Sequence, residues 1–242
     1  MTAKETRAQA REALSGQWGK TILFFIIYFI VTIVLSLVLG FIPFVGNVVE
    51  TIISVPLVIG LTSTLIKIKR KEDFGYFDFI NVAIEMFGKS WGVVGHTILK
   101  MLVPVISLVA SIIIIVIGSV MLTASFSGFS MFMIVVGIIL YLVTLVWVIT
   151  KGYLYALTSA ILADNEEMPT LDIVEKSETL MNGNRMKLFL LGLSFIGWGI
   201  LSSLTFGIGL IWLVPYMAIA QICFYDNLIG DTEIKETEKI SE

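Results

Sequence analysis

The sequence predicts an all-α, polytopic integral membrane protein: a helical bundle of six transmembrane helices with three further helices at the cytoplasmic surface. Three observations point to this class: an apolar composition, uncharged segments of membrane-spanning length, and charges confined to alternate connectors. Of the 242 residues, 57% are hydrophobic and 14% charged, and the mean hydropathy is +0.95. A soluble domain of this length could not cover its surface with so few charges.

Six segments are long and apolar enough to cross about 30 Å of hydrocarbon, which takes roughly 20 helical residues. They lie at about 21–40, 48–66, 101–122, 130–150, 188–204 and 206–225. The first is too long for the core of a signal peptide, and no small-residue cleavage site follows it. We therefore interpret it as a retained transmembrane helix.

The basic residues predict the orientation. Three connectors are short and uncharged, namely FIPFVGN, LTASFSGFS and TFGIG, whereas the other connectors and both termini hold essentially all the lysine and arginine. By the positive-inside rule both termini are cytoplasmic. Basic residues near the first hairpin are expected to contact the anionic inner leaflet. These lipid-facing residues are Lys4, Arg7, Arg11, Lys67, Lys69, Arg70 and Lys71.

Two lysines are expected to mark the membrane boundary of the second hairpin. Apolar character runs from Trp91 to Thr123 and from Phe129 to Ala163, and each run approaches ~50 Å as a straight helix. Lys100 and Lys151 each lie roughly ten residues from the cytoplasmic end of their run. We expect their amines to reach the headgroups. The part of each run beyond its lysine then extends into the cytoplasm as helix and needs cover from protein.

A short, more polar helix precedes each hairpin. Thr2 and Glu5 can form a capping box at the start of the first such helix, and Pro169 or Thr170 can start the third. The three units, about 1–70, 72–163 and 165–230, predict a threefold internal repeat within one membrane domain, 1–230. A polar cytoplasmic tail, 231–242, follows.

Glycines and prolines are expected to bend the chain at fixed places in these units. A glycine ends each interfacial helix and permits a sharp reorientation before the chain enters the bilayer. A proline inside a span kinks the helix and frees backbone carbonyls. The expected hinges and kinks are Gly16, Gly88, Gly183, Pro56, Pro104 and Pro215.

Few residues are candidates for chemistry. Glu50 is the only acid expected on the outer side, where it could be a cation entry site or could simply reach water near the helix start. His96, the only histidine, shares a helical face with Lys100, so the two could form a proton-sensing cluster or serve as interfacial anchors.

No catalytic, cofactor-binding or metal-binding set is predicted. The acidic connector of Asp164, Glu166 and Glu167 lacks the spacing of a cation cage and is interpreted as a solvated loop. The single cysteine, Cys223, cannot form an internal disulfide. Net charge is −3, and nothing suggests a nucleic-acid partner.

Three stretches carry a resemblance to a known family. REALSGQWGKTILFF, MPTLDIVEKSETLMNGNRMKLFLLGLSFIGWGIL and LTFGIGLIWLVPYMAIAQICFYDNL resemble domain of unknown function 975, mostly polytopic membrane proteins of Gram-positive bacteria. The resemblance covers nearly the whole chain. It implies a multi-pass protein of the bacterial cytoplasmic membrane and supplies no reaction or catalytic residue.

The residues leave three functions open. The first is a non-catalytic accessory, scaffold or lipid-interface protein, with membrane lipids and a protein partner or a second copy as its contacts. The second is a small transporter or carrier of a lipid or amphiphile, which repeated units and proline-broken helices favour. The third, a membrane-embedded enzyme, is the least favoured, because the positioned reactive groups that catalysis needs are scarce.

Overall fold

Helices form nearly all of the computed structural model, which describes residues 2–123 and 127–241. Eleven α-helices and no strand occur in these two ranges. The helices are α1 (Ala3–Leu14), α2 (Trp18–Gly40), α3 (Val45–Arg70), α4 (Asp78–Glu85), α5 (Phe87–Thr123), α6 (Ser127–Leu154), α7 (Thr158–Asp164), α8 (Thr170–Met181), α9 (Arg185–Leu193), α10 (Ile196–Leu204) and α11 (Leu210–Ser241). The all-α class is therefore confirmed.

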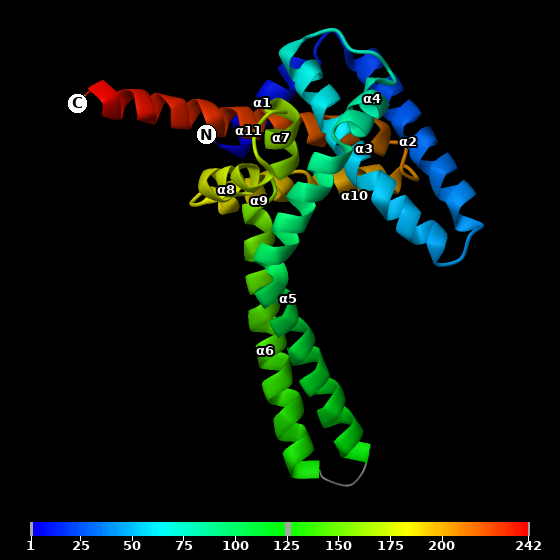
Figure 1. Ribbon diagram of the computed structural model, residues 1–242, viewed down its shortest axis with the longest axis vertical. Helices are drawn as coiled ribbons and strands as arrows, with labels where there is room; N and C mark the ends of the chain where they lie inside the picture. The colour runs from blue at the N-terminus through cyan, green and yellow to red at the C-terminus, as the bar shows by residue number, and fades with distance from the viewer. Residues whose placement is uncertain (1, 124–126, 242) are drawn as a thin grey trace.

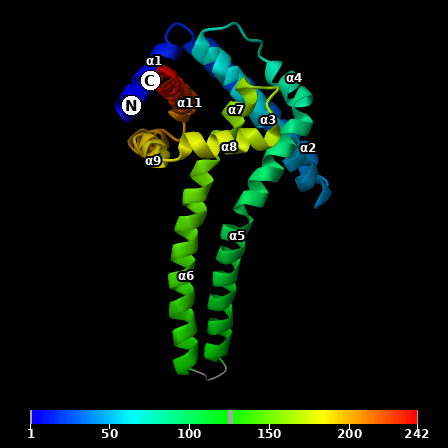
Figure 2. The same ribbon diagram turned by 60° about the vertical axis from the view of Figure 1, so that its left-hand side comes forward.

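The long helices form hairpins that diverge from a layer of short helices. The α5–α6 hairpin projects from this layer on its own, and the α2–α3 hairpin leans to one side (Figure 1). Helix α11 crosses the direction of α5 and α6 instead of running beside them (Figures 1 and 2). Both termini lie at the end of the molecule that carries the short helices. The hairpins thus share one base and diverge from it.

Five helical segments in the described ranges are long and apolar enough to cross a membrane. They are Trp18–Gly40, Val45–Arg70, Phe87–Thr123, Gly128–Asp164 and Arg185–Leu204. They contain the first five predicted spans. The sixth, 206–225, begins in the turn before α11 and is otherwise part of that helix, which is not one of these five segments. The count of six therefore stays a prediction.

The fifth predicted span is helical but broken. It comprises α9 and α10, separated at Ser194 and Phe195. In a continuous helix the carbonyl of Ser194 would accept from the amide of Trp198. Here that carbonyl accepts from Nη1 of Arg7 at 3.2 Å. The side chain of α1 therefore takes the place of a helical hydrogen bond at the break.

The two predicted extensions of the second hairpin differ in how far protein covers them. The part at 152–163 is packed against other helices, whereas Ile98 and Leu99 in 91–99 are 55% and 67% exposed. Helix α5 runs without interruption through 91–99, whereas 152–163 contains a break between α6 and α7. The hydroxyl of Ser177 in α8 donates to the carbonyl of Leu154 at 2.8 Å, which stabilises the end of α6. Leu154, Ile161 and Leu162 are buried. Helix α8 packs on α5, α6 and α7 to provide this cover.

Two of the three predicted hinge glycines lie at turns of the chain. Gly16 and Gly183 have φ angles of 84° and 80°, a region that favours glycine, and both lie between a surface helix and the helix that follows it. The prediction for Gly88 was wrong, because this residue lies in the first turn of α5. The chain instead turns at Met86, which is the C-cap of α4 and has a negative φ that any residue can adopt. Pro56, Pro104 and Pro215 lie inside α3, α5 and α11, which continue through them.

Three of the short helices connect successive hairpins by packing on the hairpin of the preceding unit, and the first of them packs on the last hairpin. Helix α4 packs on α3, α8 packs on α5 and α6, and α1 packs on α11. Helix α1 begins with the predicted capping box: the amide of Glu5 donates to the Thr2 hydroxyl, and the amide of Thr2 donates to the Glu5 carboxylate. The latter bond holds the pKa of Glu5 below its ordinary value.

The core lies where these short helices meet the bases of the hairpins. An aromatic cluster joins α2 to α4 and to the segment before it: the ring centroid of Phe24 lies 5.7 Å from that of Phe74 and 5.9 Å from that of Phe79. Gly60 of α3 lets α4 approach closely, since a Cβ there would lie 2.0 Å from the carbonyl oxygen of Phe79. The far part of the α5–α6 hairpin, by contrast, leaves most of its apolar side chains exposed.

Candidate functional site

Several of the predicted lipid-facing cations are paired with carboxylates of the protein. Nη2 of Arg70, at the end of α3, lies 2.7 Å from Oδ1 of Asp164 at the end of α7. The other oxygen of Asp164 accepts from the buried hydroxyl of Tyr225 in α11 at 3.1 Å. Lys69 pairs with Asp226 of α11. These contacts join three helices that are far apart in the sequence.

Helices α1, α4 and α8 each also have a polar link to the hairpin on which they pack. Lys67 of α3 lies 3.6 Å from Asp78 of α4. Gln9 of α1 and Asn227 of α11 exchange amide hydrogen bonds at 2.7 and 3.3 Å. The third link involves α8 and the two boundary lysines.

Lys100 and Lys151 meet at one carboxylate of α8. Nζ of Lys100 lies 3.0 Å from Oε2 of Glu178, and Nζ of Lys151 lies 3.8 Å from Oε1. Glu175, one turn earlier in α8, lies 3.8 Å from Lys100. Both lysines therefore lie at the base of the α5–α6 hairpin and pair with protein carboxylates. Their role as boundary residues that reach the headgroups stays a prediction.

The remaining cations of the predicted lipid-facing set are Lys4, Arg7, Arg11 and Lys71. Among the described residues none of these four has an ion pair with a carboxylate. Lys4, Arg11 and Lys71 are exposed, whereas Arg7 is half-buried. The uncompensated positive charge of the first unit is thus concentrated on α1 and at the end of α3.

A groove with a volume of about 610 Å³ lies beside two of these cations. Helices α1, α2, α10 and α11 form its walls. Its basic residues are Arg7 and Arg11 of α1. The rest of its lining is mainly aromatic and aliphatic, with a few hydroxyls: Trp18, Trp198, Leu201, Ser202, Thr205, Gly209, Trp212, Leu213 and Tyr216. We refer to this site as the arginine–tryptophan groove.

Arg7 is held at one end of the groove. Its Nη1 donates to the carbonyl of Ser194, just before α10, and its own carbonyl accepts from the hydroxyl of Tyr216 at 3.1 Å. Its Nε is buried and has no hydrogen-bond partner among the described residues. Thr205 and Gly209 mark the opposite end, at the turn between α10 and α11. The groove therefore has a cationic end and an apolar wall that leads away from it.

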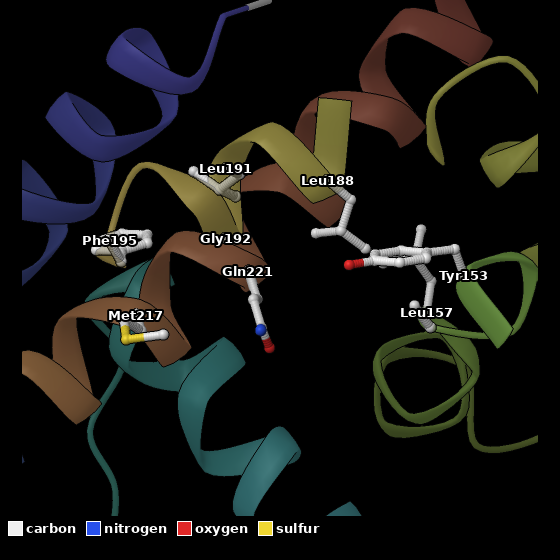
Figure 3. A pocket seen from close by; sticks show the side chains of 9 residues that line it. Tyr153, Leu157, Leu188, Leu191, Gly192, Phe195, Met217 and Gln221 are labelled. Carbon is white, nitrogen blue, oxygen red and sulfur yellow. The ribbon is translucent and has the colours of Figure 1, made fainter. Parts of the chain in front are cut away.

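A second, smaller cavity of about 240 Å³ lies between the end of α6 and helices α9 and α11. Leu188, Leu191, Phe195 and Met217 supply much of its apolar lining (Figure 3). Its main polar side chains are Tyr153 and Gln221, which extend toward the space between these helices (Figure 3). This lining contains no charged residue, so the cavity suits an apolar group or water more than an ion.

The other candidate residues are not brought together. Glu50 lies near the start of α3 and has no hydrogen bond or ion pair with the described residues. His96 and Lys100 share α5, but the ion pairs of Lys100 go to α8 and do not involve His96. The carbonyl of Glu166 in the acidic connector accepts from Lys89. No group of three or more His, Cys, Asp or Glu side chains in the described part of the chain could hold a metal ion.

Sequence reasoning missed the arginine–tryptophan groove. The sequence places Arg7 and Arg11 among the lipid-facing basic residues, and it places Trp198, Trp212 and Tyr216 only within predicted spans. The available signal was the presence of two tryptophans and a tyrosine close to the loop of the third hairpin. Nothing in the local sequence connects that loop to α1, which lies almost 190 residues earlier.

These features define the class of protein: an all-helical chain with five helices that can cross a membrane by length and composition, joined at one end by a charged helical layer. The chain belongs to the family described as protein of unknown function (DUF975), whose model matches residues 1–232. The resemblance seen in the sequence is therefore confirmed. No curated protein and no solved structure matches the chain.

Proposed function

We propose that the protein is a non-catalytic lipid-interface protein of the cytoplasmic membrane, with six spans, a threefold repeat and both termini in the cytoplasm. Its charged helical layer lies at the inner surface, where it organises the bases of the hairpins and contacts anionic lipid. The protein acts as an accessory or scaffold component, without catalysis.

The observation that carries this proposal is the cyclic packing of α1, α4 and α8 on the hairpins. Each of these short helices has a polar link to the hairpin before it, through Asp78, through Glu178 and through Gln9 with Asn227. The same relation holds three times, which supports the repeat. Because these charges and amides join helices to helices, they fit a structural layer better than a reaction centre.

The orientation is supported by the distribution of charge. The helices that carry the cations of the layer lie with both termini at one end of the molecule (Figure 1). The connector between α2 and α3 lies away from that end (Figure 1). Positive charge is retained on the cytoplasmic side of membrane proteins. Anionic lipids of the inner leaflet attract each basic residue near the surface by about 1 kcal/mol.

Cysteine labelling tests the orientation. In a Cys223→Ser background, Phe41→Cys is expected to react with an impermeant maleimide on intact cells, and Lys71→Cys only after permeabilisation. Both side chains are exposed, so access depends on the side of the membrane. The opposite labelling pattern would reject the orientation.

Extraction in native nanodiscs tests the lipid-interface function. Mass spectrometry is expected to find anionic lipid enriched relative to the bulk membrane, because Lys4, Arg7, Arg11 and Lys71 carry charge that no carboxylate compensates. A stoichiometric protein partner would identify the pathway that the accessory protein serves. The absence of both would contradict the proposal.

A carrier of a lipid or amphiphile is the second candidate, and the arginine–tryptophan groove favours it. A groove with one cationic end and an apolar wall fits an amphiphile better than a metal ion or a sugar. Flux of labelled lipid in proteoliposomes would distinguish a carrier from an accessory protein. An unchanged cellular phenotype after alanine replacement of Glu50, His96 and Asp164 would count against an enzyme.

A further inference from the structure

The arginine–tryptophan groove has the chemistry of a binding site for one kind of lipid. We propose that it binds a single anionic phospholipid, with the headgroup phosphate between Arg7 and Arg11 and an acyl chain along α10 and α11. This inference rests on the proposed function, since it names the lipid class and the place where the protein holds it.

The charge balance at the cationic end favours an anion. Neither Arg7 nor Arg11 has an ion pair with a carboxylate in the described ranges. Arg11 is exposed and Arg7 is half-buried, so both guanidinium groups keep surface that a ligand can reach. A phosphate can accept from several guanidinium donors at once, and arginine suits this geometry better than lysine.

The backbone at this end adds to the preference. Ile196 begins α10 close to Ser194, whose carbonyl already accepts from Arg7. The first amides of a helix carry partial positive charge and favour an anion. The helix break and the two guanidinium groups thus coincide at one place.

The apolar wall fits an acyl chain and not a soluble anion. Trp198 and Trp212 are about half exposed, at 54% and 52%, and Leu201 is 55% exposed. Helix α10 has nine residues, which is about 14 Å of wall. A volume of about 610 Å³ also lies within the usual range for ligand sites, roughly 300–1,000 Å³.

Tryptophan and tyrosine give the groove an amphipathic rim. Trp18 and Tyr216 flank the arginines, and their rings lie 6.5 Å apart between centroids. Such side chains prefer the level of the headgroups, where one part of the ring is apolar and the other is wet. A lipid whose phosphate binds at the arginines would place its glycerol region at these rings.

The test is native mass spectrometry of the full chain in detergent, with equal amounts of phosphatidylglycerol and phosphatidylcholine. The expected result for the wild type is retention of one phosphatidylglycerol in preference to phosphatidylcholine. Arg11→Gln is expected to reduce this preference about fivefold, the effect of one basic residue at an anionic surface. Arg11 is chosen because Arg7 also holds the helix break.

Lys4→Gln is the matched control. It removes the same charge from the same helix, and Lys4 is exposed and lies outside the groove. It is expected to leave the preference unchanged. A second variant, Trp212→Ala, is expected to weaken retention of both lipids without removing the preference for phosphatidylglycerol. Protection of the Cys223 thiol from labelling shows whether each variant is folded.

The outcomes separate this inference from the proposed function. Equal effects of Arg11→Gln and Lys4→Gln, with phosphatidylglycerol still preferred, would overturn the groove assignment and leave a general lipid-interface role intact. No preference in the wild type would overturn both. Displacement of the bound lipid by millimolar glycerol 3-phosphate would show that the site recognises a soluble phosphate, which would overturn the assignment to lipid.

Discussion

Asp164 joins three helices, and its loss should loosen the core in a measurable way. Its carboxylate binds Arg70 at 2.7 Å and accepts from the hydroxyl of Tyr225 at 3.1 Å. Asp164→Ala removes both contacts and leaves the hydroxyl of Tyr225, a fully buried residue, without its acceptor. Because Asp164 is at the end of α7, the substitution should separate α7 from α3 and α11.

The expected loss of unfolding free energy follows from how exposed Tyr225 and Arg70, the two partners of Asp164, are. A buried donor left without a partner costs about 1–3 kcal/mol. The side chain of Arg70 is 40% exposed, so its ion pair with Asp164 is screened by solvent and contributes about 1 kcal/mol. We therefore expect Asp164→Ala to lower the free energy of unfolding by about 3 kcal/mol.

The single cysteine provides the assay. Cys223 is 1% exposed and lies in the core two residues before Tyr225, so a maleimide reaches its thiol only when the core opens. A change of 1.4 kcal/mol alters the open population tenfold. The labelling rate of Asp164→Ala in detergent should therefore rise about a hundredfold over the wild type.

The control is Glu167→Gln, which removes a negative charge from the same connector. Glu167 is exposed and has no hydrogen bond or ion pair with the described residues. Cys223 should therefore be labelled in Glu167→Gln at the same rate as in the wild type. Tyr225→Phe should give a smaller increase, about tenfold, because Asp164 keeps its pair with Arg70. Equal labelling of Asp164→Ala and Glu167→Gln would refute the reasoning.

Two further predictions concern α4 and the segment before it. Gly60→Ala should lower the free energy of unfolding by about 1–3 kcal/mol, because the new methyl group meets the carbonyl of Phe79. Gly95→Ala is the control, since its methyl group enters open space and should be neutral. Thermal unfolding of the two variants tests this difference. The carboxylate of Asp73 accepts from Lys20 at 2.5 Å, and this bond holds the pKa of Asp73 below its ordinary value of 3.8. The contact therefore adds stability above pH 3.8 that is lost as the pH falls through the lower, folded-state pKa. Carbon NMR titration should find a midpoint below 3.8 that rises toward 3.8 in Lys20→Met, because the bond to the backbone of Phe74 remains; an unchanged midpoint would contradict the assignment.

Much of the fold could be predicted because it depends on neighbouring residues. The capping box at Thr2 and Glu5 is a contact across three positions, and the turns at Gly16 and Gly183 need a conformation that glycine adopts at no steric cost. Gly88 shows the limit of this reasoning. Its position after a short helix resembles the other two, yet the chain turns at Met86 with an ordinary negative φ and needs no glycine.

The candidate site could not be predicted in the same way. Lys67, Lys69 and Arg70 look alike in the sequence as a basic cluster facing the lipid. Their partners are Asp78, Asp226 and Asp164, two of which lie far along the chain, and only the packing of α3 on α7 and α11 brings them within reach.

Composition and hydropathy are enough to predict the class of protein, the position of the apolar helices and the connectors that carry the charge. These properties follow from the free energy of transferring each residue into hydrocarbon, which depends almost entirely on the type of residue. The packing of distant helices, in contrast, sets the divergence of the hairpins, the separation of α9 from α10, and the contacts of Arg7 with Ser194 and Tyr216 at the arginine–tryptophan groove. The physical reason is that these contacts join residues about 190 to 210 positions apart, and helix docking brings such residues together with no local signal in the chain.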